Sequence, residues 1–227
     1  MESLVARHEQ AVRPPQQERA RQTRLAIVRA AAELFDKHGY GGTKIADVVD
    51  RIGMTKGALY FHFPDKESLA VAVMEAQMEG LSVPPQVVKT QELVDAGYAL
   101  AHLLRSDPIQ RGATRLTMDQ DSDQVDRTRS MQLWLSFTES ILVEARKREE
   151  LLDIVEISEA SNYFVGAFAG IQNMAHAFDD RTSLVDRLTV LWKYTLPSIV
   201  RPAIVTKLKL DPARGERIAH GAAPSDT

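Results

Sequence analysis

Residues 43–63, TKIADVVDRIGMTKGALYFHF, contain two short helix patterns separated by a tight turn. Thr43 is a good N-cap for the first helix, whose apolar residues recur on one helical face at Ile45, Val48, Val49 and Ile52. Gly53 ends that helix, because a residue without Cβ readily takes the left-handed conformation of a helix C-terminus. Thr55 can cap the second helix, which Pro64 prevents from continuing. The pattern predicts a helix-turn-helix, whose second helix fits the major groove of DNA.

The second helix, expected from Lys56 to Phe63, has few residues that need burial. Leu59 and Phe63 can face inward, since they lie four residues apart. The remaining side chains are available for a surface: Thr55, Lys56, Gly57, Ala58, Tyr60 and His62. Gly57 costs about 1 kcal/mol relative to Ala inside a helix, so we expect a close approach to the backbone there. Either a DNA phosphate or base edge, or packing on the preceding helix, would explain that glycine.

The net charge of −3 conceals a division along the chain of 227 residues, which is long enough for one large or two small domains. Residues 1–66 hold 11 Lys and Arg against 8 Asp and Glu, a net +3. Residues 67–227 hold 17 against 23, a net −6. Because the basic segment coincides with the helix-turn-helix, the division indicates a nucleic-acid-binding head on a body with another role.

The N-terminal segment is polar and contains two consecutive prolines, so residues 1–20 are expected to be a disordered basic tail. Its arginines would either be solvated or contact DNA phosphates with salt-dependent affinity: Arg13, Arg19, Arg21 and Arg24. A helix is expected over Gln22–His38, with Gly39 as its stop. That helix completes a three-helix DNA-binding domain over residues 21–66.

Residues 67–214 are expected to form an all-α body, because no period-two alternation is long enough to indicate strands. A helix that begins at the partial capping box of Asp65 and Ser68 joins the head to this body. After the break at SVPPQ, further helices are expected at about 88–105, 108–118, 125–148, 153–178 and 184–196, the last ending before Pro197. Residues 215–227 are expected to be a disordered tail.

The helices at 153–178 and 184–196 have more apolar surface than one partner helix can cover. Gly166, Ala167 and Gly170 would let another helix approach closely. These features predict a homodimer formed through a four-helix bundle, which suits DNA sites with two-fold symmetry.

Several protein classes are not indicated. No apolar run approaches the roughly 18 residues of a membrane span, and the N-terminus lacks the apolar core of a secretion signal. The absence of Cys fits a reducing cytoplasm, which is the expected location. The acidic segment 119–126 resembles half a calcium loop, but Gln124 and Ser130 occupy the positions that need Gly and Glu. No enzyme motif is present, so no catalytic residue, metal or cofactor is expected.

The chain resembles the TetR family of bacterial transcriptional repressors. The matching features are AAAELFDKHGYGGTKIADV at 30–48, GMTKGALYFHFPDKESL at 53–69 and the all-helical body. Within the family, TKGALYFHF, Trp134 and FVGAFAGIQ at 164–172 resemble the γ-butyrolactone-type autoregulator receptors, or related pseudo-receptors, of antibiotic-producing filamentous bacteria.

The resemblance implies which residues contact an operator. Thr55 and Lys56 match base-reading positions, and Lys56 suits a guanine O6/N7 edge. Gly57 and Ala58 match positions of close approach. Positions that hold phosphate are matched by Thr43, Tyr60, His62 and Lys66. His62 could equally be a structural residue beneath the following helix.

The resemblance also implies a ligand site in the body. Trp134 matches an indole that covers a lactone, although without the resemblance it would be assigned to the core. Further candidates to line the cavity are Phe137, Phe168, Gln172, Tyr98 and Leu116. The implied function is a dimeric repressor that a γ-butyrolactone-like molecule releases from a palindromic operator. The alternative is a pseudo-receptor, or an efflux or catabolic regulator, that responds to an antibiotic or another apolar small molecule.

Overall fold

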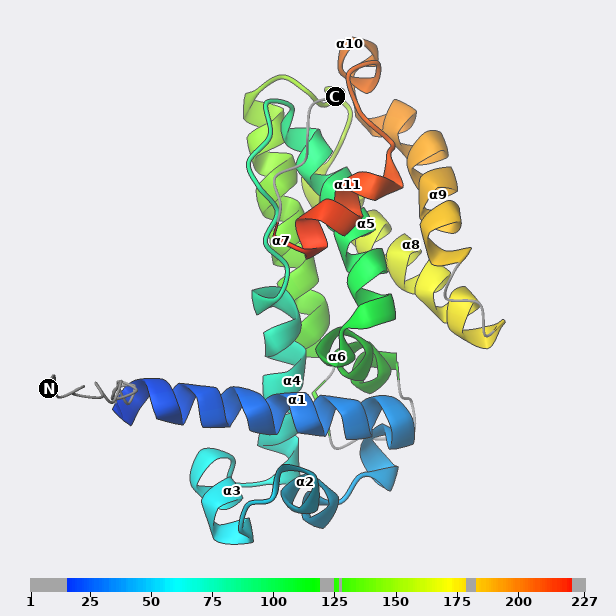
Figure 1. Cartoon of the computed structure of the whole chain (residues 1–227). Coiled ribbons are helices and arrows are strands. Elements are labelled where there is room, and N and C mark those ends of the chain that lie inside the picture. The colour runs from blue at the N-terminus through cyan, green and yellow to red at the C-terminus, as the bar shows by residue number, and fades with distance from the viewer. Residues whose placement is uncertain (1–15, 119–124, 127, 179–182, 222–227) are drawn as a thin grey trace, which may run out of the picture.

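The computed structural model describes residues 16–118, 125–126, 128–178 and 183–221, and these residues form helices and no β-strand (Figure 1). In chain order the helices are α1 Gln16–Gly42, α2 Ile45–Ile52, α3 Lys56–His62, α4 Lys66–Glu79, α5 Lys89–Ser106, α6 Pro108–Met118, α7 Thr128–Lys147, α8 Ile157–Ala177, α9 Leu184–Ile199, α10 Pro202–Val205 and α11 Pro212–Ala219. The prediction of an all-α fold is confirmed. No helix in the described part of the chain is both long and apolar enough to cross a membrane.

Helix α1 begins earlier than predicted, so the expectation of disorder is wrong for residues 16–20. These residues are mostly good helix formers, and Glu18 pairs with Arg21 at 3.0 Å, three residues further along. Gly39 has φ 67° and ψ −179°, which interrupts the helix where the sequence predicted its end. Residues 1–15, and most of the acidic segment 119–126, lie outside the described residues.

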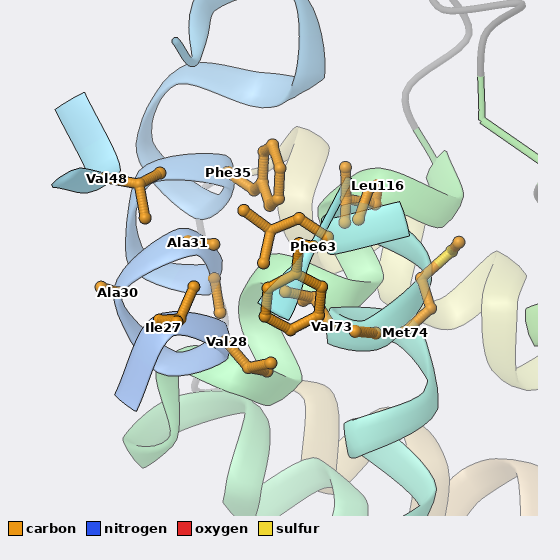
Figure 2. Close-up of a cluster of buried hydrophobic side chains, with 14 of the residues drawn as sticks. Ile27, Val28, Ala30, Ala31, Phe35, Val48, Phe63, Val73, Met74 and Leu116 are labelled. Atoms are coloured by element: carbon orange, nitrogen blue, oxygen red, sulfur yellow. The ribbon is translucent and has the colours of Figure 1, made fainter. Parts of the chain in front are cut away.

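The hydrophobic core of the head includes residues from the body (Figure 2). Phe35 and Phe63 pack together with side chains of α4, and α6 adds Ile109, Ala113 and Leu116 to the same cluster. At Gly112 an added Cβ would lie 2.4 Å from the carbonyl oxygen of Ala32, so the backbones of α6 and α1 are in direct contact. Helix α6 of the body thus packs in the same hydrophobic core as the helices of the head, and this core holds the two parts together.

The C-terminal region is more ordered than predicted. Helix α9 continues through Pro197 to Ile199, so the prediction that it ends before Pro197 is wrong. Pro197 removes the one helical bond that its N–H would donate, and only two helical residues follow it. The predicted disorder from residue 215 is wrong for residues 215–219, which belong to α11. Gly215 and Ile218 are buried against the body, and Figure 1 shows α11 lying across α5.

Candidate DNA-binding surface and ligand pocket

The helix-turn-helix is formed as predicted, except at its first cap. Gly53 adopts the left-handed conformation (φ 65°, ψ 36°) at the end of α2. The Thr55 hydroxyl then caps α3 by accepting a hydrogen bond from the Ala58 backbone N–H at 3.2 Å. Leu59 and Phe63 are buried and hold α3 against the head. The opposite side of α3 therefore faces solvent.

Most of the residues expected to contact DNA lie on that exposed side. Thr55, Lys56, Gly57, Ala58 and Tyr60 are all exposed. A Cβ added at Gly57 would meet nothing within 4 Å, so packing on α2 does not explain the glycine. The space outside Gly57 is open to an approaching partner.

Thr43 is not the N-cap of α2, contrary to the prediction. The N-cap of α2 is Lys44, whose backbone N–H donates to the Asp47 carboxylate at 3.1 Å. Thr43 is only 2% exposed, and its hydroxyl donates to the Gly39 carbonyl at 2.8 Å. The sequence missed this because the interrupted end of α1 offers the hydroxyl a nearer acceptor. The Thr43 side chain is thus buried, and the exposed Lys44 stands at the start of α2 instead.

The remaining phosphate candidates lie around α3. Lys66 is half-buried at the first turn of α4, and its Nζ lies 4.0 Å from the centre of the Tyr40 ring, a cation–π geometry. Burial lowers the pKa of the Lys66 ammonium. His62 is half-buried with its ring edge-on to Phe61 at 5.4 Å. Phe61, between Tyr60 and His62 on α3, is 84% exposed, and it was not predicted as a site residue.

A pocket in the body is lined by side chains from each of the helices α4 to α9, and its empty volume, which includes space open to solvent, is about 750 Å³. Four predicted ligand residues line it: Trp134, Phe137, Phe168 and Gln172. The Trp134 and Phe137 rings meet edge-to-face, with centroids 6.0 Å apart. Most of the lining is apolar, as is usual in small-molecule sites. The pocket therefore suits an apolar molecule with few polar groups.

The structure does not bring Tyr98 and Leu116 to this pocket. Tyr98 is 1% exposed, and its hydroxyl lies 2.9 Å from the Thr189 hydroxyl, between α5 and α9. Leu116 is also 1% exposed and packs in the core shared with the head (Figure 2). Both belong to helices that line the pocket, but each side chain faces a different neighbour.

Gln77 of α4 lines the pocket and forms hydrogen bonds with residues of two other helices, although it was not predicted as a site residue. It is 3% exposed, and its Oε1 accepts a hydrogen bond from the Trp134 indole N–H at 3.1 Å. Its Nε2 donates to the Thr114 hydroxyl at 3.2 Å. Its backbone carbonyl accepts a hydrogen bond from the Gln110 side-chain amide at 2.9 Å. A Gln on the inward face of a helix was the available signal. These bonds join the pocket to the helix that follows the DNA-binding head.

Trp192 of α9 also lines the pocket, although it was not predicted as a site residue. It is 3% exposed, and its indole N–H has no hydrogen-bond partner among the described residues. A buried N–H without an acceptor is energetically costly, so a ligand oxygen that reached it would gain a favourable contact.

A helix-turn-helix with an exposed second helix, joined to a body with an apolar pocket, is the arrangement of a DNA-binding regulator. The model of the family described as "Bacterial regulatory proteins, tetR family" matches residues 27–73. The A-factor receptor protein of Streptomyces griseus is 33% identical over 193 residues, which cover 85% of this chain and 69% of that protein.

Solved structures agree in fold and sequence. The full-length native TylP, a TetR regulator from Streptomyces fradiae, is 36% identical with a TM-score of 0.84, and the match covers 92% of this chain and 93% of that chain. A structure titled as the molecular basis for control of antibiotic production by bacterial hormones is 29% identical, with a TM-score of 0.66, covering 79% and 98%. The chain therefore belongs to the TetR family, and it is a DNA-binding transcriptional regulator related to the A-factor receptor.

Proposed function

We propose that the protein is a dimeric repressor that a γ-butyrolactone-like signalling molecule releases from a palindromic operator, and that it controls secondary metabolism. The observation that carries the proposal is the hydrogen bond between Trp134, in the wall of an apolar pocket, and Gln77 of α4. Helix α4 follows the reading helix α3 after a short link, so a change in the pocket can reach the DNA-binding surface.

The DNA side of the proposal rests on α3. Lys56 is exposed at its first turn, with Gly57 and Ala58 leaving the backbone open to a groove. We assign base contact to Lys56 and Thr55, and phosphate contact to Tyr60, His62 and Lys66. Two such helices in a dimer would read half-sites about 34 Å apart, or a multiple of that distance.

The dimer surface that we propose is formed by α8 and α9. Both helices expose large apolar side chains: Tyr163, Met174, Val190 and Tyr194. A Cβ added at Gly166 or Gly170 would meet nothing within 4 Å in the single chain, which leaves room for a second copy. An exposed apolar surface of this kind is typical of an interface.

The ligand side of the proposal uses two polar groups in an apolar pocket. Gln172 offers an amide to a lactone carbonyl or a hydroxyl group, and the Trp192 indole N–H offers a second donor. Phe137 and Phe168 would bury an alkyl chain beside Trp134. Few polar groups in an otherwise apolar site favour a small ester or lactone with a hydrocarbon tail over a charged metabolite.

Release from DNA requires only that the ligand bind the released state more tightly. A ligand that fills the pocket would press on the Trp134 ring and, through its contact with Gln77, shift α4. A 100-fold preference for the released state corresponds to about 2.7 kcal/mol per site. Two sites in a dimer would then strongly deplete the DNA-bound form.

Replacing Lys56 by Ala is expected to weaken binding to a specific operator by about 1–3 kcal/mol, because a side chain that reads a base edge is lost. The measurement is a fluorescence-anisotropy titration with labelled operator DNA, repeated with a scrambled duplex. Lys207→Ala is the matched control, since that exposed lysine follows α10 at the end of the molecule opposite α3 (Figure 1). An operator affinity equal to that of the control would remove Lys56 as a reader.

Replacing Trp134 by Ala is expected to raise the effector concentration needed for DNA release by about tenfold or more, since a ring that covers the ligand is worth at least about 1.4 kcal/mol. Operator affinity without effector should change much less. Tyr98→Phe is the control, because its hydroxyl contacts Thr189 outside the pocket lining. An undiminished effector response in Trp134→Ala would return Trp134 to a purely structural role.

A further inference from the structure

Three potential metal ligands lie together outside the pocket, where α11 crosses α5. They are His102 of α5, Glu216 of α11 and His220, the C-cap of α11, and their ligand atoms all lie within 4.8 Å of one another. The two imidazole rings meet edge-on, with centroids 5.2 Å apart. Glu216 and His220 are four residues apart, so both project from one face of α11. His102 is half-buried, whereas the two ligands on α11 are exposed.

Buried contacts fix the backbone positions of this cluster. At Gly215 an added Cβ would lie 2.4 Å from the Tyr98 carbonyl carbon, so α11 touches the backbone of α5 directly. Beside that crossing, the Arg214 guanidinium makes two hydrogen bonds of 2.9 Å to the Asp95 carboxylate. His102 lies one helical turn beyond Tyr98. The helices that carry the cluster are therefore held in place whether or not an ion is bound.

The hydrogen bonding of His220 suits a metal ligand. Its Nδ1 lies 2.9 Å from the Glu216 backbone carbonyl oxygen. An Nδ1–H that donates to this carbonyl leaves the lone pair on Nε2 available to a cation. Metal-binding histidines commonly donate their second ring N–H to a carbonyl or carboxylate in this way, which fixes the tautomer and the ring orientation.

We propose that His102, Glu216 and His220 bind a divalent transition-metal ion of the Zn²⁺ type. Two imidazoles and one carboxylate favour zinc, nickel or copper over magnesium or calcium, which prefer oxygen ligands. Side-chain rotation would bring the three ligands to bonding distances of about 2.0–2.2 Å, and water would complete the coordination. The sequence predicted no metal site, because His102 is far from the other two ligands along the chain.

The ion would connect the C-terminal helix to a wall of the ligand pocket. Helix α5 contributes Leu93, Ala96 and Leu100 to the pocket lining, and α11 covers another part of the same helix. A bound ion would therefore stabilise the docking of α11 and stiffen α5 beside the ligand. This role is independent of the identity of the effector.

The test is isothermal titration of the tag-free, full-length protein with ZnCl₂ after dialysis against a chelator. The expected result is one Zn²⁺ per chain, with a Kd that rises about tenfold or more in His102→Ala and in His220→Ala, since each removes a ligand. Glu216→Gln, which keeps the size of the side chain, should also weaken binding. His176→Ala is the matched control, because that exposed histidine lies on α8.

A second readout is the midpoint of thermal unfolding. Zn²⁺ should raise this midpoint for the wild type and for His176→Ala, because a ligand that binds only the folded state stabilises it. It should raise the midpoint much less for His102→Ala and for His220→Ala. Saturable binding that is unchanged in His102→Ala, His220→Ala and Glu216→Gln would overturn the proposal. Weak binding to several sites, without saturation at one ion per chain, would overturn it as well.

Discussion

Asp95→Asn is expected to lower the free energy of unfolding by about 3–5 kcal/mol, because it removes the negative charge that pairs with the buried Arg214 cation. Asp95 is fully buried in α5, and Arg214 is 1% exposed in α11. Besides the two bonds to Arg214, the Asp95 carboxylate accepts a bond of 2.8 Å from Gln91. The amide of Asn matches the carboxylate in shape, so the variant isolates the loss of charge from a loss of packing.

The measurement is urea unfolding followed by circular dichroism, at one fixed protein concentration because a dimer unfolds in a concentration-dependent way. Asp153→Asn is the matched control, since Asp153 is 84% exposed in its pair with Arg201. Exposed ion pairs contribute little, so the control should unfold like the wild type. If Asp95→Asn also behaved like the wild type, the ion pair would not hold α11 to α5.

Leu59→Ala is expected to destabilise the protein by about 2–5 kcal/mol and to abolish operator binding together with the order of α3. Leu59 has no exposed surface, and it packs in the cluster that contains Phe35 and Val48. It is one of the two residues that anchor the reading helix to the head, so truncation leaves a cavity beneath α3. Unfolding by urea and the operator titration should both report the change.

Phe61→Ala is the control for Leu59→Ala on the same helix. Phe61 loses a larger side chain, but it is 84% exposed, so its removal should leave the unfolding midpoint almost unchanged. A Leu59→Ala protein as stable as Phe61→Ala would show that α3 is not anchored through Leu59. Reduced operator affinity in Phe61→Ala, without loss of stability, would add Phe61 to the DNA-contacting residues.

The helix-turn-helix could be predicted from sequence because its signals are local. The left-handed Gly53, the cap at Thr55 and the inward Leu59 and Phe63 each depend on residues a few positions away. The exposed set on α3 follows from the same spacing. In contrast, the cap of α2 depended on how α1 ends, and that competition for the Thr43 hydroxyl was not visible in the sequence.

The errors in the body arise from contacts between distant segments. Helix α11 is short and polar in sequence, and it is ordered because Arg214 pairs with Asp95, which lies 119 residues earlier in the chain. The pocket is assembled from several helices, so helical spacing found Phe137, Phe168 and Gln172 but could not exclude Tyr98. Gln77 was missed for the same reason, since its partner Trp134 belongs to another helix.

The most direct test of ligand-controlled repression is an anisotropy titration of the wild-type protein onto labelled DNA from upstream of its own gene, with and without a γ-butyrolactone extract. If the proposed repressor is correct, binding is tight, weakens with salt and is lost when the extract is added. Tight binding that the extract does not affect would contradict the lactone and direct the search to antibiotics and biosynthetic intermediates. Binding no tighter than to a scrambled duplex, at this promoter and at those of neighbouring genes, would contradict the proposed repressor itself.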